Sequence, residues 1–134
     1  MAATGAEPLS VFHLAADAER SFAYAQAVGD GQRLYVAGTL SLDDAFAPVG
    51  MGDMAAQLAQ IYARIGRTLA AHGLGFCDVI KENVFVTDMD AMLAANDVRA
   101  GTYGAHTPAC TVVEVRRLAF PECLAEIEVV ARLK

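Results

Sequence analysis

The sequence lacks tryptophan, carries little charge and offers few groups that bind metals. Its 134 residues include three cysteines and three histidines, and only 19% are charged. The cysteines, Cys77, Cys110 and Cys123, form no C-x-x-C pair, so neither a zinc knuckle nor a disulfide framework is expected. The histidines are equally scattered along the chain. We therefore expect reduced thiols, no metal and no cofactor.

Basic residues are too few to attract a nucleic acid. Ten lysines and arginines stand against sixteen acidic residues, which gives a net charge of −6. A protein of this charge repels phosphate backbones. The N-terminal segment has no basic stretch, and its apolar run around Val11 to Leu14 is too short to cross a membrane or direct secretion. We expect a cytoplasmic protein that binds neither nucleic acid nor membrane.

Apolar residues, in contrast, are abundant. They make up 55% of the chain, whereas an average domain has about 45–50%. The length suits a single domain over residues 1–134 with one hydrophobic core. The excess of aliphatic residues predicts that apolar surface is also buried between subunits.

The pattern of apolar residues predicts two helices and at least five strands. Two apolar runs in "SFAYAQAVGDGQRLYVAGTLSL" flank turn residues and predict a β-hairpin. A helical face runs from Asp53 to His72 through Met54, Leu58, Ile61, Ile65 and Leu69. The remaining elements are a strand over Val79 to Val86, a helix from about Ala91 to Tyr103, a strand from Pro108 to Val115 and a last strand in "LAEIEVVARL". The order ββαβαββ indicates an α+β fold whose helices cover one sheet face.

The chain resembles the RidA/YjgF family of reactive intermediate deaminases, also labelled L-PSP endoribonucleases. The resemblance covers about residues 22–132 and rests on "YAQAV", "LYVAGTLSLD", "RIGRTLAAHGLGFCDVIKENVFVTDMD", "MLAANDVRAGTYG", "TPACTVVEVRRL" and "AEIEVVA". It implies a chorismate-mutase-like fold with two helices on one face of a mixed sheet. It also implies a homotrimer with a central barrel and clefts between subunits, where enamines and imines are hydrolysed to 2-keto acids and ammonia without metal or cofactor.

The resemblance also assigns site residues. Tyr24 and Gly38 match the cleft tyrosine and glycine of the first two strands, and Asn96 matches the asparagine of the second helix. Glu126 matches the glutamate of the last strand that positions the attacking water. Arg117 stands where the family has an arginine after the "VEV" strand.

Two positions depart from the family. Where deaminases read P-A-R, this chain has Cys110 after Pro108 and Ala109, and Ala37 replaces a common serine. The missing arginine would grip a substrate carboxylate in a bidentate pair. A charge-assisted hydrogen bond contributes about 1.5–3 kcal/mol, so its loss weakens a 2-imino acid about tenfold to a hundredfold. The substrate is therefore expected to differ from a simple 2-imino acid.

Several of these residues have a second interpretation. Cys110 is either a nucleophile, for which His106 lies too far along an extended strand, or a small side chain lining the pocket. Glu126 and Glu128 share one side of their strand, either in a cleft or at an edge. Tyr24 either caps the cleft or packs on the hairpin. Asn96 and Arg117 are either ligand-binding or solvated.

The leading hypothesis is a homotrimer that hydrolyses a small enamine or imine, with Glu126 positioning water and Tyr24, Gly38, Asn96, Cys110 and Arg117 binding substrate. The alternative is a non-catalytic small-molecule binder or regulatory trimer, which the loss of the arginine at Cys110 favours. A ribonuclease is disfavoured by the acidic charge.

Overall fold

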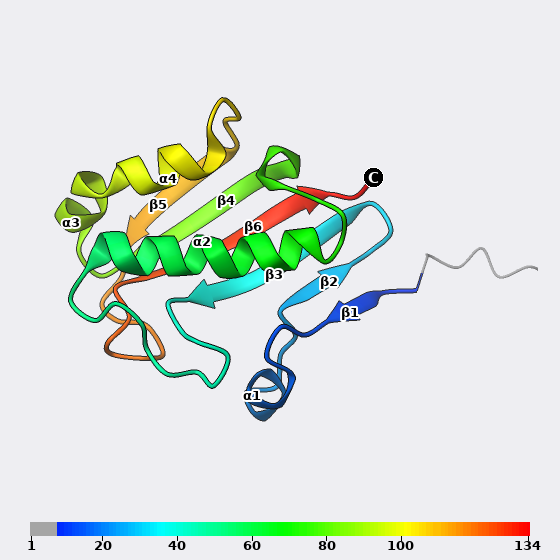
Figure 1. The fold of residues 1–134 in the computed structure, drawn as a ribbon, viewed down its shortest axis with the longest axis horizontal. Helices are drawn as coiled ribbons and strands as arrows, with labels where there is room; N and C mark the ends of the chain where they lie inside the picture. The colour runs from blue at the N-terminus through cyan, green and yellow to red at the C-terminus, as the bar shows by residue number, and fades with distance from the viewer. Residues whose placement is uncertain (1–7) are drawn as a thin grey trace, which may run out of the picture.

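A single six-stranded sheet forms the framework of the protein (Figure 1). The computed structural model describes residues 8–134. The strand order is β1-β2-β3-β6-β4-β5, and every neighbouring pair is antiparallel except β4 and β5, which are parallel. The strands are β1 (Ser10–Phe12), β2 (Ala27–Gly29), β3 (Arg33–Leu40), β4 (Val79–Val86), β5 (Ala109–Glu114) and β6 (Ala125–Arg132).

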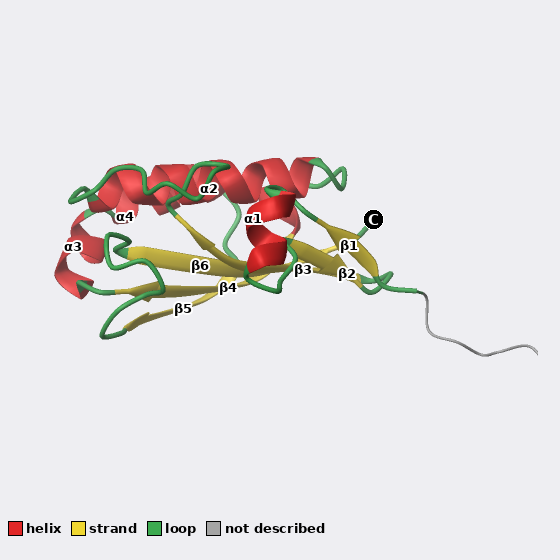
Figure 2. Ribbon diagram, turned by 90° about the horizontal axis from the view of Figure 1, so that it is seen from below, coloured by secondary structure: helices red, strands yellow, loops and turns green. Residues whose placement is uncertain are grey.

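The longer helices lie together on one face of the sheet (Figure 2). The helices are α1 (Ala16–Ser21), α2 (Met54–Ala70), the 3-10 turn η1 (Phe76–Asp78), α3 (Met89–Ala94) and α4 (Asn96–Tyr103). Asp53 caps α2 because its side chain accepts a hydrogen bond from the Ala56 amide. This arrangement confirms the α+β fold, with helices on one face of a mixed sheet.

Two details of the predicted element order were wrong. The ββαβαββ order omitted β1 and α1, because three residues are too few to show a strand period. The helix expected from Ala91 to Tyr103 begins at Met89 and is interrupted at Ala95, whose φ of −100° and ψ of 8° leave the helical region. Asn96 and Asp97 follow, and both residue types favour helix starts over helix interiors.

The sheet has one covered face and one open face. In β6 the alternate residues Ile127, Val129 and Ala131 are buried under the helices. Glu126 and Glu128 therefore point to the open face. Tyr35 and Val113 belong to the same face and remain 45% and 39% exposed. None of the helices within residues 8–134 is long and apolar enough to cross a membrane. The prediction made for the N-terminal segment falls partly on residues 1–7, which lie outside the described part of the chain.

Candidate active site

A bulge in β3 shapes the site. The pairing of β3 with β6 is broken between Val36 and Thr39, which leaves Ala37 and Gly38 out of register. The Ala37 amide donates instead to the Gln26 carbonyl oxygen at 2.8 Å. Bulges of this kind bend a strand and re-aim its side chains, and they are frequent beside active sites.

A cavity of about 310 Å³ lies beside the bulge. Its polar lining comes from Tyr24, Gln26, Thr39, Arg64 and Glu126. Its apolar lining includes Phe22, Leu40, Leu42, Phe46 and Phe120. An apolar wall with a few convergent polar groups is the usual composition of a small-molecule site.

Glu126 packs directly against the backbone of the bulge. A Cβ atom built on Gly38 would lie 2.9 Å from Cδ and 3.0 Å from Oε1 of Glu126. Only glycine therefore leaves the carboxyl group in this position. Burial raises the pKa of Glu126, and the neighbouring carboxylate of Glu128 raises it further. A carboxyl group with a raised pKa is suited to exchange protons with a bound reactant.

Tyr24 contributes a hydroxyl donor to the same cavity. Burial raises the pKa of Tyr24 to about 12, with Glu19 and Glu126 adding to the shift and Arg64 opposing it. The phenol is therefore protonated at neutral pH. Within residues 8–134 its hydroxyl group has no hydrogen-bond partner, so it can donate to a ligand.

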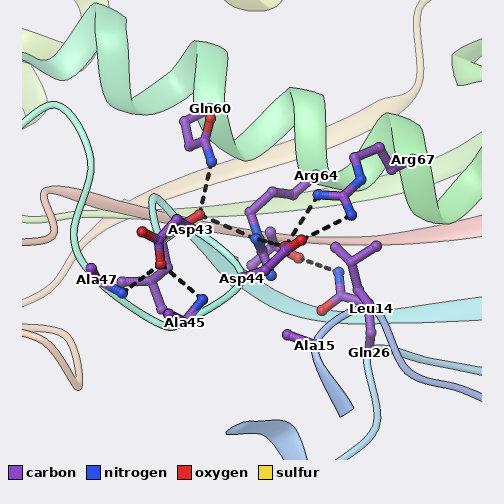
Figure 3. Close-up of polar contacts among 12 residues, drawn as sticks. Leu14, Ala15, Gln26, Asp43, Asp44, Ala45, Ala47, Gln60, Arg64 and Arg67 are labelled. Atoms are coloured by element: carbon purple, nitrogen blue, oxygen red, sulfur yellow. Dashed lines mark hydrogen bonds and ion pairs between the residues drawn. The ribbon is translucent and has the colours of Figure 1, made fainter. Parts of the chain in front are cut away.

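Arg64 brings a guanidinium group from α2 to the cavity. Its side chain is only 4% exposed. Nη1 donates to the Leu42 carbonyl oxygen at 3.2 Å and to Oδ1 of Asp44 at 2.9 Å. Asp44 also accepts two hydrogen bonds from Arg67, both at 3.2 Å (Figure 3). These contacts, with the hydrogen bond from Gln60 to Leu42, tie the loop after β3 to α2.

The predicted site residues fall into two groups. Tyr24, Gly38 and Glu126 meet in the cavity. Asn96 is exposed at the start of α4 and lines no part of the cavity. Arg117 is exposed, and its guanidinium donates to the Leu118 and Ala119 carbonyl oxygens at 3.1 and 3.2 Å, so it supports the loop that carries Ala119 to the cavity wall.

Cys110 lies on the helix side of β5, whereas Glu126 points to the open face of the sheet. The Cys110 sulfur contacts Oε1 of Glu82 at 3.4 Å. Glu82 is fully buried and also accepts hydrogen bonds from the Tyr62 and Tyr103 hydroxyls and from Arg99 Nε. Within one chain, Cys110 therefore belongs to a buried polar cluster around Glu82 and not to the cavity.

The environment of Cys110 predicts a poorly reactive thiol. Burial raises its pKa, and the Glu82 carboxylate raises it further. Within residues 8–134 no hydrogen bond joins His106 to the Cys110 thiol, and the His106 Nε2 instead contacts the Val79 carbonyl oxygen at 2.7 Å. At pH 7 we expect iodoacetamide to label Cys110 no faster than Cys77, which is also exposed. Residue-resolved mass spectrometry measures both rates, and preferential labelling of Cys110 would restore the nucleophile interpretation.

Sequence reasoning missed Arg64 and Glu82. Arg64 occupies the buried stripe of α2 together with Ile61, Ile65 and Thr68, so its signal was a charged residue at an apolar position. Glu82 gave a similar signal inside a strand but lies far along the chain from the groups that bind it. Between residues 8 and 134, no three His, Cys, Asp or Glu side chains gather as a metal site.

Comparison with known proteins establishes the family. The family model described as Endoribonuclease L-PSP matches residues 15–133. The chain belongs to this family. The match confirms the resemblance to RidA/YjgF proteins seen in the sequence.

Relatives match most of this chain. A RutC family protein of Pyrococcus horikoshii, PH0854, is 36% identical over 81% of this chain and 85% of its own length. The 2-iminobutanoate/2-iminopropanoate deaminase of Capra hircus is 30% identical over 71% of this chain and 69% of its own. The crystal structure of Rv2704 from Mycobacterium tuberculosis, a YjgF/YER057c/UK114 family member, matches with a TM-score of 0.82 and 29% identity, covering 94% of this chain and all of that one.

Proposed function

We propose that this protein hydrolyses a small imine or enamine in the cavity beside the β3 bulge. The observation that carries the proposal is the Glu126 carboxyl group, held against Gly38 in a largely apolar cavity and raised in pKa. The reaction class agrees with the name of the Capra hircus relative, an imino-acid deaminase.

Glu126 and Tyr24 are the groups of the cavity that take part in this hydrolysis. An enamine first becomes an imine when one proton moves from its nitrogen to its carbon. Water then attacks the imine carbon while Glu126 accepts one proton of the water and passes it to the nitrogen, which gives a carbinolamine. The hydroxyl proton next moves through Glu126 to the nitrogen as the C–N bond breaks, so that ammonia leaves and a carbonyl group forms. The Tyr24 hydroxyl donates a hydrogen bond to the reacting group throughout.

The functional unit is proposed to be a homotrimer with clefts between subunits. The open face of the sheet exposes Tyr35 and Val113 and has no helix over it. Burying such a face against other copies removes apolar surface from water. Cys110 lies on the edge strand β5, so only the β5 strand of another copy can bring this position near a cavity.

Two departures from the deaminase pattern bear on the substrate. Cys110 stands where deaminase-type relatives have a guanidinium group, and Ala37 stands where they commonly have a hydroxyl group. They also support the competing proposal, a small-molecule binder or regulatory trimer that performs no chemistry. Ribonuclease activity, which the family label suggests, fits poorly with the net charge of −6.

Turnover of freshly generated imines tests the proposed function. An amino-acid oxidase converts amino acids with aliphatic or aromatic side chains to imines, and ammonia release is followed with and without the protein. We expect release to accelerate in proportion to protein concentration. A protein that binds 2-oxo acids but accelerates no imine would be a binder, and RNA cleavage by the pure protein would revive the ribonuclease alternative.

A further inference from the structure

We propose that Arg64 binds the anionic end of the substrate, so that the substrate is an acid held from helix α2 instead of from strand β5. This inference rests on the proposed function, because it concerns the ligand of the same cavity. It identifies a specificity-determining residue that the sequence analysis did not single out.

The geometry leaves part of Arg64 available to a ligand. Only Nη1 makes hydrogen bonds within residues 8–134, to Leu42 and Asp44. No fully buried side-chain nitrogen or oxygen in this part of the chain is without a hydrogen-bond partner. Nε and Nη2 therefore keep some accessible surface, and Arg64 is one of the residues that line the cavity. A guanidinium group with two adjacent N–H donors matches a carboxylate.

The charge around Arg64 also favours an anion. Arg64 and Arg67 share the single carboxylate of Asp44, so within residues 8–134 the two positive charges have only one ion-pair partner between them. Arg67 and Asp44 are about half exposed, at 53% and 54%, so water screens their charges, whereas Arg64 is nearly buried. A partly compensated charge in a buried position is stabilised by an incoming counter-ion.

Arg64 and Glu126 act on the same small space. Arg64 lowers the pKa of Tyr24 and Glu126 raises it, so both groups lie near the phenol, and all three side chains line the one cavity. An acid bound at Arg64 therefore keeps its neighbouring carbon inside the cavity that holds the proton-exchanging carboxyl group. This is the relation that a 2-imino acid requires, because its carboxylate and imine carbon are adjacent.

Three phenylalanines indicate the rest of the substrate. Phe22, Phe46 and Phe120 pack around one another with ring centroids 5.9–6.2 Å apart. Phe46 lies in the loop that Asp44 ties to Arg64, so the apolar wall and the anion-binding group are mechanically linked. We infer an imino acid with a branched aliphatic or aromatic side chain.

Binding of a stable product analogue tests the role of Arg64 apart from catalysis. Isothermal titration compares 4-methyl-2-oxopentanoate with 4-methyl-2-pentanone, a neutral ketone with a similar apolar skeleton. Arg64→Met should weaken binding of the acid at least about tenfold and change the affinity for the ketone by less than about twofold. Arg67→Met is the matched control, because it removes the other partner of Asp44 outside the cavity, and it should change acid binding less than about twofold.

The remaining outcomes are equally decisive. Equal acid affinity of the wild type and Arg64→Met, or no acid binding by the wild type, would overturn the inference. If Arg64→Met does not fold, Arg64→Lys takes its place; lysine keeps the charge but lacks two adjacent N–H donors, so acid binding should weaken several-fold while ketone binding stays unchanged, and unchanged acid binding would overturn the inference. Arg64-dependent binding without turnover of any imine would leave the anion site standing and remove the proposed hydrolysis.

Discussion

Glu126→Gln should lower imine hydrolysis at least about a hundredfold while making the fold more stable at neutral pH. The loss follows from removing the group that accepts the proton of water, an effect of about 10²–10⁴-fold in general acid–base catalysis. The gain follows because the raised pKa means that the folded protein prefers Glu126 protonated. The stability that the folded protein gains from protonated Glu126 is fully present below the unfolded pKa of about 4.3. It is lost as the pH rises through the folded pKa. A neutral glutamine removes the penalty at pH 7.

Glu128→Gln provides the matched control for this prediction. Glu128 lies two residues further on the same face and accepts a hydrogen bond from Asn83 Nδ2 at 3.1 Å. The variant should keep turnover within a few-fold. Because Glu128 raises the pKa of Glu126, its removal should move the acid limb of the kcat/KM profile to lower pH. Thermal unfolding at pH 7 and pH–rate profiles measure both effects, and an active Glu126→Gln variant would exclude Glu126 as the base.

The elements that sequence analysis predicted well are those with a long, regular period. Helix α2 showed its buried face directly, and Leu58, Ile61, Ile65 and Leu69 are all at most 1% exposed. Strand β6 likewise alternates between buried residues and its two glutamates. In both cases the burial of one face decides the structure, and the spacing of apolar residues along the chain shows which face is buried.

Features that depend on contacts distant in the sequence were not predictable in this way. Helix α1 is held by Glu19, whose buried carboxylate accepts backbone N–H groups of Leu14, Ala15 and Gln26. The six residues of α1 contain no pattern that predicts such a contact. The β3 bulge was not predictable either, because Ala37 and Gly38 fit the pattern of a regular strand.

The candidate site contains residues that the sequence predicted and one that it did not. Tyr24, Gly38 and Glu126 were placed by resemblance, and their meeting in one cavity depends on the bulge. Arg64 was overlooked because a lone arginine within a helix is usually solvated. Only the position of the loop after β3, fixed by Asp44, shows that this arginine lies at the wall of a cavity.

Glu82→Gln should destabilise the fold by about 3 kcal/mol, the lower end of the cost of breaking a buried charge pair. Every neighbour of the fully buried carboxylate is a donor: the Tyr62 and Tyr103 hydroxyls at 2.9 and 2.6 Å, Arg99 Nε and the Cys110 thiol. A glutamine of the same shape leaves no cavity but turns one acceptor into a donor. It also leaves Arg99, only 18% exposed, without its counter-ion.

Tyr62→Phe is the control for the Glu82 prediction, because it removes a single hydrogen bond and keeps the aromatic packing against Phe76 and Tyr103. Its expected cost is about 1 kcal/mol. Chemical denaturation at one fixed protomer concentration measures both variants, since association shifts apparent stability. Equal costs would mean that Glu82 acts as one more hydrogen-bond partner. A threefold difference would mean that its charge organises β4, β5 and α4 around Arg99, with Cys110 a passive member of that cluster.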